Sequence, residues 1–490
     1  MKRKLIALTC ALALTATALA GCSSKKKETE APKETQKVEE TKAAESEAPA
    51  AETEAAAPAA AETEAAAPAA AETEAAEAVV EETEAAAVET EAAVAETEAE
   101  AAETEAEASG DTAGTVTIGV FEPASGDNGA GGKQEVLGMQ YANEVQNTVE
   151  IGGETYDVVL NIQDNESSTD KAPSAASAAA EGASVVLGSY GSAVSIAAGD
   201  IFKSAGVGAI GVTCTNPQVT EGNDNYFRIC FLDPFQGTVL ANFASEKFSA
   251  KKAYVLTKLG DDYSAGLGHY FSQAFKELGG EVIEETFPEG TADFTSYITT
   301  AINENVDVIM APTSTEAAQV IIEAAATQGV KVPLLAGDTW DSNVILSAAE
   351  GKDVEIYVTT FYQEGADAEF DAGIKEWING DATNLANNGG DDTIAAVTVM
   401  GYDAYFVALE AIKNAGSADP ADVLAAIPDT TYTGVTGAIA FGENGDAARD
   451  TAVVKQANTK DGSWEFIATQ GVADAGSAET EAEAAETEAE

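Results

Sequence analysis

Four apolar segments of this 490-residue chain each end in a short group of hydroxyl and carboxyl residues. Ser189-Tyr190-Gly191-Ser192 follows "VVLG", and Thr213-Cys214-Thr215 follows "GAIGV". Asp261-Asp262-Tyr263-Ser264 follows "YVLTKLG", and Asp338-Thr339-Trp340-Asp341 follows "LLAG". Hydroxyl groups and the free N–H groups of a helix start bind a carboxylate, and a carboxylate opposite them binds an ammonium. The four groups together suit a zwitterion.

Each of these residues also has a simpler interpretation. Ser192 could cap a helix, Asp338 could be an ordinary loop carboxylate, and Tyr263 could pack at an interface. The glycines of residues 126–132 suggest a phosphate loop, but no Gly-Lys-Ser/Thr sequence follows them. The single histidine, His269, lies in a helical pattern, which argues against a histidine metal site and against a Ser-His-Asp triad. We therefore expect a binding protein and no enzyme, with neither metal nor cofactor.

The composition excludes several classes of partner. The chain has 84 acidic and 25 basic residues, which gives a formal net charge of −59. Such a charge argues strongly against nucleic acid and anionic surfaces as partners. The segment from 111 to 473 is long enough for two domains. Its two cysteines are Cys214 and Cys230, and the sequence favours neither a disulfide between them nor two free thiols.

Apolar runs alternate with helical patterns throughout this segment. Continuous apolar strands between helices indicate parallel sheets covered on both faces. We therefore predict an α/β fold of two doubly wound parallel-sheet lobes, in which ligands lie beyond the carboxyl ends of the strands. The expected strands are 115–121, 156–164, 183–189, 207–212, 252–258, 281–287, 306–312, 332–338 and 355–362, and the expected helices are 131–147, 168–182, 192–206, 264–278, 293–304 and 315–328.

The two ends of the chain differ from this pattern. Residues 1–21 read as a signal peptide, and Leu19-Ala20-Gly21-Cys22 resembles the bacterial lipobox, in which Cys22 carries lipid. The alternative is an ordinary secretory signal that contains a cysteine. Residues 22–110 then form a tether of Glu, Thr, Ala and Pro that cannot bury enough apolar surface to fold, and 474–490 form an acidic tail of the same kind. We expect a chain anchored by lipid at the extracytoplasmic face of a bacterial membrane.

The folded segment resembles the type I periplasmic binding proteins, and within them the leucine/isoleucine/valine-binding group that feeds ABC importers. The resemblance covers roughly residues 115–467 and rests on the order and spacing of several short motifs. These are "EPASG" after the first strand, "GSYGS" at 188–192, "TCTNPQVT" at 213–220, "YFRI" at 226–229, "DDYSAG" at 261–266, "MGYDAYFVALEAIKNAG" at 400–416 and "IAFGENGD" at 439–446.

The resemblance implies a role for each residue of a ligand site. Ser192 and Thr215 would bind the ligand carboxylate through hydroxyl and backbone N–H groups. The backbone carbonyl of Thr213 and the carboxylate of Asp338 would hold the ligand ammonium, and Tyr263 would close over the ligand from the second lobe.

Two positions depart from the family pattern and put the side-chain pocket in doubt. Gly131 stands where an aromatic residue often follows the first loop, and Thr313 stands where a tyrosine can follow "VIMA". Tyr190 and Trp340 are the candidates to fill the space.

The resemblance also implies three crossings between the lobes, near residues 232, 363 and 442. Lobe 1 would comprise 111–232 and 363–442, lobe 2 would comprise 233–362 and 443–473, and the lobes would close on a ligand by a hinge motion.

The implied function is that of a receptor that delivers an amino acid to ABC permease and ATPase subunits. We expect a monomer and a branched-chain or other apolar amino acid. Aromatic amino acids, amides or small peptides remain open as ligands. A ligand-sensing module for a signalling partner is the alternative function, because the same fold serves both.

Overall fold

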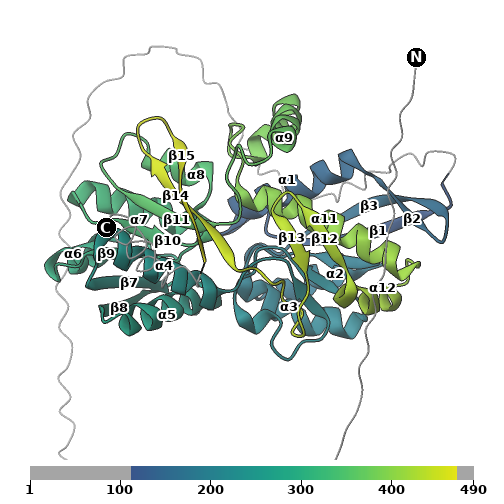
Figure 1. Cartoon of the computed structure of the whole chain (residues 1–490), viewed down its shortest axis with the longest axis horizontal. Helices are drawn as coiled ribbons and strands as arrows, with labels where there is room; N and C mark the ends of the chain where they lie inside the picture. The colour runs from purple at the N-terminus through teal and green to yellow at the C-terminus, as the bar shows by residue number, and fades with distance from the viewer. Residues whose placement is uncertain (1–111, 472–490) are drawn as a thin grey trace, which may run out of the picture. The chain divides into compact units, whose positions relative to one another are not determined.

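The computed structural model describes residues 112–471, in which two large β-sheets lie between layers of helices (Figure 1). The first sheet has the strand order β2-β3-β1-β4-β5-β6. All its neighbouring strands are parallel except β2, which runs antiparallel to β3. Its strands are β1 Thr115–Glu122, β2 Thr148–Ile151, β3 Glu154–Asp164, β4 Val185–Leu187, β5 Ala209–Gly211 and β6 Tyr226–Arg228.

Helices cover both faces of the first sheet because its central strands are apolar on both sides. Ile118 of β1 packs in one cluster with residues of α1 Gly129–Val145, α11 Ala396–Ala415 and α12 Pro420–Ala426. Phe121 of the same strand points to the other face, against α2 Ala172–Ala180 and α3 Ser192–Ala205. The helix α1 is also tied to α11, where Asn143 donates a hydrogen bond of 2.9 Å to the hydroxyl of Tyr405.

The second sheet has the order β15-β14-β11-β10-β9-β7-β8. The strands β7 to β11 are parallel to one another, whereas β14 runs antiparallel to β11 and to β15. Its strands are β7 Lys252–Lys258, β8 Glu281–Phe287, β9 Val308–Met310, β10 Leu334–Ala336, β11 Ile356–Thr360, β14 Thr451–Asn458 and β15 Ser463–Gly471. One face is covered by α4 Asp233–Phe248 and α5 Asp262–Glu277, and the other by α6 Thr295–Asn303, α7 Thr315–Gln328 and α8 Asn343–Ala349.

Short elements complete the chain between the sheets. The helices α9 Ala368–Gly380 and α10 Ala382–Asn387 precede α11, and the hairpin of β12 Thr431–Gly434 and β13 Gly437–Ala440 follows α12. The described part of the chain also contains three single 3-10 turns, η1 Pro217–Val219, η2 Asp338–Trp340 and η3 Ile427–Asp429. None of the helices between residues 112 and 471 combines the length and the apolar character needed to cross a membrane.

The predicted α/β fold of two lobes is confirmed, with one difference in the sheets. The antiparallel strands β2, β14 and β15 make both sheets mixed rather than purely parallel. The chain passes from one sheet to the other between β6 and β7, between β11 and α11, and between β13 and β14. The lobe boundaries at 232, 363 and 442 stay predictions. The signal peptide, Cys22, the tether and the acidic tail lie outside the described residues.

Candidate functional site

The first part of the candidate site lies where β4 and β5 end. Ser192 is the first residue of α3, and its side chain is buried. Its hydroxyl makes no capping bond in α3 and instead accepts a hydrogen bond of 3.2 Å from the backbone N–H of Asn216. Ser192 therefore fastens the start of α3 to the loop after β5, which brings two of the predicted groups together.

The loop after β5 carries the two predicted threonines, Thr213 and Thr215, both buried. The hydroxyl of Thr213 donates a hydrogen bond of 2.5 Å to Oε2 of Glu135. The hydroxyl of Thr215 faces the carboxyl of Asp233, whose pKa burial raises to about 8. Both threonines thus lie among carboxyl groups that the sequence analysis did not assign to the site.

Arg228 holds this loop in place from strand β6. The guanidinium is fully buried and donates to the carbonyls of Cys214, at 2.8 Å, and Asn216. It also donates to the Thr220 hydroxyl at 2.9 Å and pairs with Asp446 at 2.6 Å. A planar group with five donors suits this task because it satisfies several oxygens at once. The motif "YFRI" contained the arginine, but nothing in the sequence pattern showed which carbonyls it would hold.

The cysteine of this loop, Cys214, is buried and unpaired, as is Cys230. Of the two alternatives, one disulfide or two free thiols, the structure contains two free thiols.

In the second lobe, Asp338 follows β10 and opens the turn η2, with 2% of its surface exposed. Its Oδ1 accepts hydrogen bonds from the amide of Gln236, at 3.0 Å, and from the hydroxyl of Tyr263, at 3.2 Å. Burial raises the pKa of Asp338 to about 6, although these two hydrogen bonds act in the opposite direction. Asp338 is therefore a positioned carboxylate rather than a free loop side chain, and Gln236 of α4 is a partner that sequence reasoning missed.

Tyr190 joins the two lobes at the level of Asp338. Its hydroxyl donates a hydrogen bond of 3.2 Å to the backbone carbonyl of Thr339. A Cβ atom on Gly131 would lie only 2.4 Å from the Tyr190 ring. The ring therefore occupies the space that a side chain at position 131 would need. Whether Tyr190 also shapes a ligand pocket stays a prediction.

Trp340 lies deeper in the second lobe. Its side chain is fully buried in the cluster that α7 and α8 form with the sheet. Its indole N–H donates a hydrogen bond of 3.2 Å to the carbonyl of Thr313, the position where the family pattern allows a tyrosine. The predicted ligand contacts of Trp340 and of the six other candidate residues stay predictions.

Two buried glutamates complete the first-lobe side of the site. Glu122 ends β1, and its Oε2 accepts a hydrogen bond of 2.7 Å from the backbone N–H of Tyr190. Glu135 lies in α1 and is fully buried. Burial raises the pKa of Glu135 to about 7, and burial together with the charge of Glu135 raises that of Glu122 well above its usual range. Glu122 was quoted within "EPASG", but neither glutamate was predicted as a site residue.

Amide side chains add a second polar contact between the lobes. Gln134 of α1 donates a hydrogen bond of 3.1 Å to Asn343 of α8 and accepts one of 3.1 Å from the hydroxyl of Ser342. On the other side of the site, Asn216 donates to the carbonyl of Asp262 at 2.7 Å. Gln134 and Asn216 therefore add hydrogen bonds between the lobes on two sides of the candidate site.

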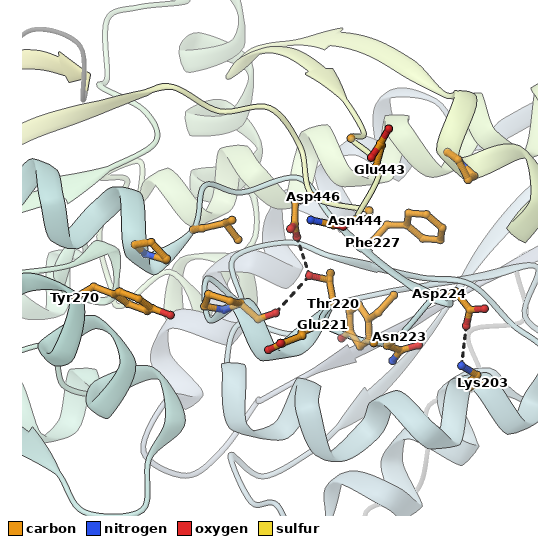
Figure 2. Close-up of a pocket in the computed structure, with 18 residues that line it drawn as sticks. Lys203, Thr220, Glu221, Asn223, Asp224, Phe227, Tyr270, Glu443, Asn444 and Asp446 are labelled. Carbon is orange, nitrogen blue, oxygen red and sulfur yellow. Dashed lines mark hydrogen bonds and ion pairs between the residues drawn. The ribbon is translucent and has the colours of Figure 1, made fainter. Parts of the chain in front are cut away.

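A groove of about 1070 Å³ lies outside this interior cluster (Figure 2). Figure 2 shows Asp446 and Thr220 beside it, and Tyr270 of α5 on its edge. An exposed ion pair of 2.7 Å between Lys203 and Asp224 lies on its rim. None of the predicted ligand residues lines the groove, so it is separate from the candidate site.

Comparisons with known proteins show what this chain is similar to. The family model described as "Periplasmic binding protein" matches residues 115–462. A Leu/Ile/Val-binding protein homolog 1 from Brucella melitensis is 31% identical over 361 residues, which are 72% of this chain and 93% of that protein.

Solved structures are similar over the same region. A leucine-binding protein, LivK, from Thermotoga maritima superposes with a TM-score of 0.64 at 32% identity, covering 73% of this chain and 99% of that one. An ABC transporter substrate-binding protein from Desulfitobacterium hafniense, solved with Leu, has a TM-score of 0.56 at 25% identity and covers 72% and 100% of the two chains.

Proposed function

The chain belongs to the periplasmic binding protein family, and on that basis we propose that it captures a branched-chain amino acid between its lobes and delivers it to an ABC importer. The family consists of binding proteins and not of enzymes. The observation that carries the proposal is that Asp338 in one lobe is a buried, positioned carboxylate and that Ser192, Thr213 and Thr215 in the other lobe are buried at strand ends.

The two ends of an α-amino acid match these two sides. A ligand carboxylate is stabilised by the N–H groups at the start of α3 and by the hydroxyls of Ser192 and Thr215. A ligand ammonium is stabilised by Asp338 and the carbonyl of Thr213. The groups that bind the ligand carboxylate lie in the first lobe, and Asp338, which binds the ligand ammonium, lies in the second. A bound zwitterion therefore holds the two lobes together, which is the physical basis of hinge closure. Tyr263 adds a hydroxyl that keeps Asp338 in position.

Two observations support a ligand with an apolar, branched side chain: what the relatives are described as binding, and the small space near Gly131. The relatives named above are described as binding leucine, isoleucine or valine. The Tyr190 ring fills the room beside Gly131, which disfavours a larger aromatic ligand.

Calorimetry on the mature chain tests the proposal. We expect leucine, isoleucine or valine to bind at least roughly 10-fold more tightly than phenylalanine, because a pocket of fixed size discriminates by 1–3 kcal/mol. Leucinamide, which lacks the carboxylate, is expected to bind roughly 100-fold more weakly than leucine, because it leaves the groups at the start of α3 without their partner. Native mass spectrometry identifies any ligand carried through purification. Tighter binding of leucinamide or of a dipeptide than of any amino acid would contradict the assignment.

We further propose that Cys22 anchors the chain to the membrane through lipid, on the extracytoplasmic side. The support is the sequence Leu19–Cys22 at the end of an apolar leader. The variant Cys22→Ala should move the protein from the membrane fraction to the medium or periplasm and abolish palmitate labelling. Cys10→Ala changes a cysteine inside the leader and is the matched control, which should stay in the membrane fraction. Retention of the Cys22→Ala protein on membranes would refute the lipid anchor.

A further inference from the structure

Glu135 is a buried carboxylate that forms no ion pair with a cationic side chain of the part of the chain that the structure describes. Its Oε2 accepts a hydrogen bond of 2.5 Å from the Thr213 hydroxyl, while Oε1 is buried and receives no hydrogen bond from any amide, N–H or hydroxyl donor of residues 112–471. The two cations buried in that part of the chain are already paired, Arg228 with Asp446 and Lys455 with Asp341. A buried charge without a partner costs several kcal/mol, so a cation that reached this carboxylate would be stabilised by it.

Glu122 is the carboxyl group next to Glu135, and it cannot provide such a cation. Its Oε2 is held by the backbone N–H of Tyr190 and, at 3.4 Å, by the hydroxyl of Ser189. Two adjacent buried carboxyls avoid repulsion by sharing one proton. Burial raises the pKa of both carboxyls, so the pair keeps one proton between them and carries a single negative charge.

The position of Glu135 connects it to the proposed ammonium site. Thr213, whose hydroxyl it binds, is the residue whose carbonyl is proposed to accept from the ligand. Tyr190 lies between Glu122, which accepts from its N–H, and Thr339, which accepts from its hydroxyl and directly follows Asp338. The charge of Asp338 also helps to raise the pKa of Glu135, so these two carboxyl groups of opposing lobes are close enough to interact. Within residues 112–471, no group of three or more His, Cys, Asp or Glu side chains is placed to hold a metal ion.

We propose that Glu135 contacts the ligand and supplies, from the first lobe, a second carboxylate for the α-ammonium that Asp338 binds from the second lobe. This inference rests on the proposed function and extends it. An ammonium group has three N–H donors, and the Thr213 carbonyl, Asp338 and Glu135 give it three acceptors. A hydroxyl or keto group at the same carbon satisfies fewer of them, so the arrangement selects α-amino acids against the corresponding hydroxy and keto acids.

The test compares Glu135→Gln with the wild type against two ligands, leucine and 2-hydroxy-4-methylpentanoate, by calorimetry. Glutamine keeps the shape of the side chain and an acceptor for Thr213 but removes the charge. We expect leucine binding to weaken roughly 10- to 100-fold, because a hydrogen bond to a charged group is lost. The hydroxy acid has no ammonium, so its affinity should change less than roughly 3-fold.

Asp403→Asn is the matched control. Asp403 is a buried first-lobe carboxylate that accepts from Val435 and Thr436 and lies in α11. Its replacement should leave leucine affinity unchanged. If Glu135→Gln fails to fold, Thr213→Val is the second variant, because it removes the hydroxyl that holds Glu135 and keeps the backbone carbonyl. This variant too should lower the affinity for leucine and leave the affinity for the hydroxy acid nearly unchanged.

The outcomes separate this inference from the function on which it rests. Equal leucine affinity in the wild type and in the folded variant would overturn the role of Glu135 and leave the proposed function standing. Equal losses for both ligands would also overturn it, because they would mean that Glu135 only shapes the site. A wild-type protein that binds no amino acid would overturn the proposed function itself.

Discussion

Replacing Asp338 by alanine is expected to weaken leucine binding by roughly 10²- to 10³-fold or more, with the fold retained. The carboxylate is buried, and it is held in place by Gln236 and Tyr263. Removing one partner of a buried ion pair costs about 3–5 kcal/mol, which corresponds to this loss of affinity. Calorimetry against leucine, isoleucine, valine and phenylalanine measures the effect, and circular dichroism checks the fold.

Two further variants rank the contributions at the same site. Asp338→Asn keeps an acceptor and loses the charge, so its affinity should lie between those of the wild type and the alanine variant. Ser192→Ala should weaken the binding free energy of leucine by only about 1–3 kcal/mol, because the backbone N–H groups at the start of α3 still bind the ligand carboxylate. An alanine variant at 338 that binds its best ligand as tightly as the wild type would rule out the zwitterion mechanism and point to an uncharged solute.

The pH dependence of binding follows from the same residue. The pKa of Asp338 is raised to about 6, and only its ionised form attracts an ammonium. A bound ammonium lowers this pKa, so ligand and proton compete. Wild-type affinity for leucine should therefore fall as the pH drops below about 6.

The second large effect concerns stability and a different aspartate, Asp341. Lys455 of β14 and Asp341 form an ion pair of 2.9 Å whose side chains are 1% and 0% exposed. The Thr360 hydroxyl also donates to Asp341 at 2.7 Å. Lys455→Met is expected to lower the free energy of unfolding by about 3–5 kcal/mol, because it leaves the aspartate buried without a counter-charge. Urea denaturation measures the change.

The control variants identify the cause of this loss. The double variant Lys455→Met/Asp341→Leu removes both charges and should recover most of the stability. Lys331→Met removes a cation from an exposed pair with Asp353, and its effect should stay within about 1 kcal/mol. A Lys455→Met protein as stable as the Lys331→Met protein would show that Asp341 does not depend on its lysine.

The parallel core of both sheets could be predicted because its strands are short, continuous and apolar. The expected strand 252–258 coincides with β7, and the expected helix 315–328 coincides with α7. The antiparallel strands at the edges of the sheets, β2 and β15, have a weaker sequence pattern. β2 has only four residues, and β15 alternates irregularly and exposes Phe466 to 52%. Neither looks like a buried strand when it is read alone.

The site could be predicted only where residues follow strands directly. Ser192 and Asp338 lie at strand ends and were found for that reason. Glu135 lies inside a helix, where a carboxylate is ordinarily exposed. The spacing of Glu135, Met139 and Ala142, all fully buried, does follow one face of a helix and could have identified it. Gln236 and Arg228 act through contacts that only the folded chain brings together.

The pairing of α1 with α11 has a consequence for the biogenesis of the protein. Asn143 and Tyr405, which join the two helices, are 262 residues apart in the sequence. The second sheet likewise acquires β14 and β15 only after the chain has returned from the first lobe. Contacts of such large sequence separation slow folding, because the chain must close long loops before it gains them. During synthesis neither lobe can be completed until most of the chain is available. An export pathway that accepts only unfolded chains therefore has time to engage this protein before it folds.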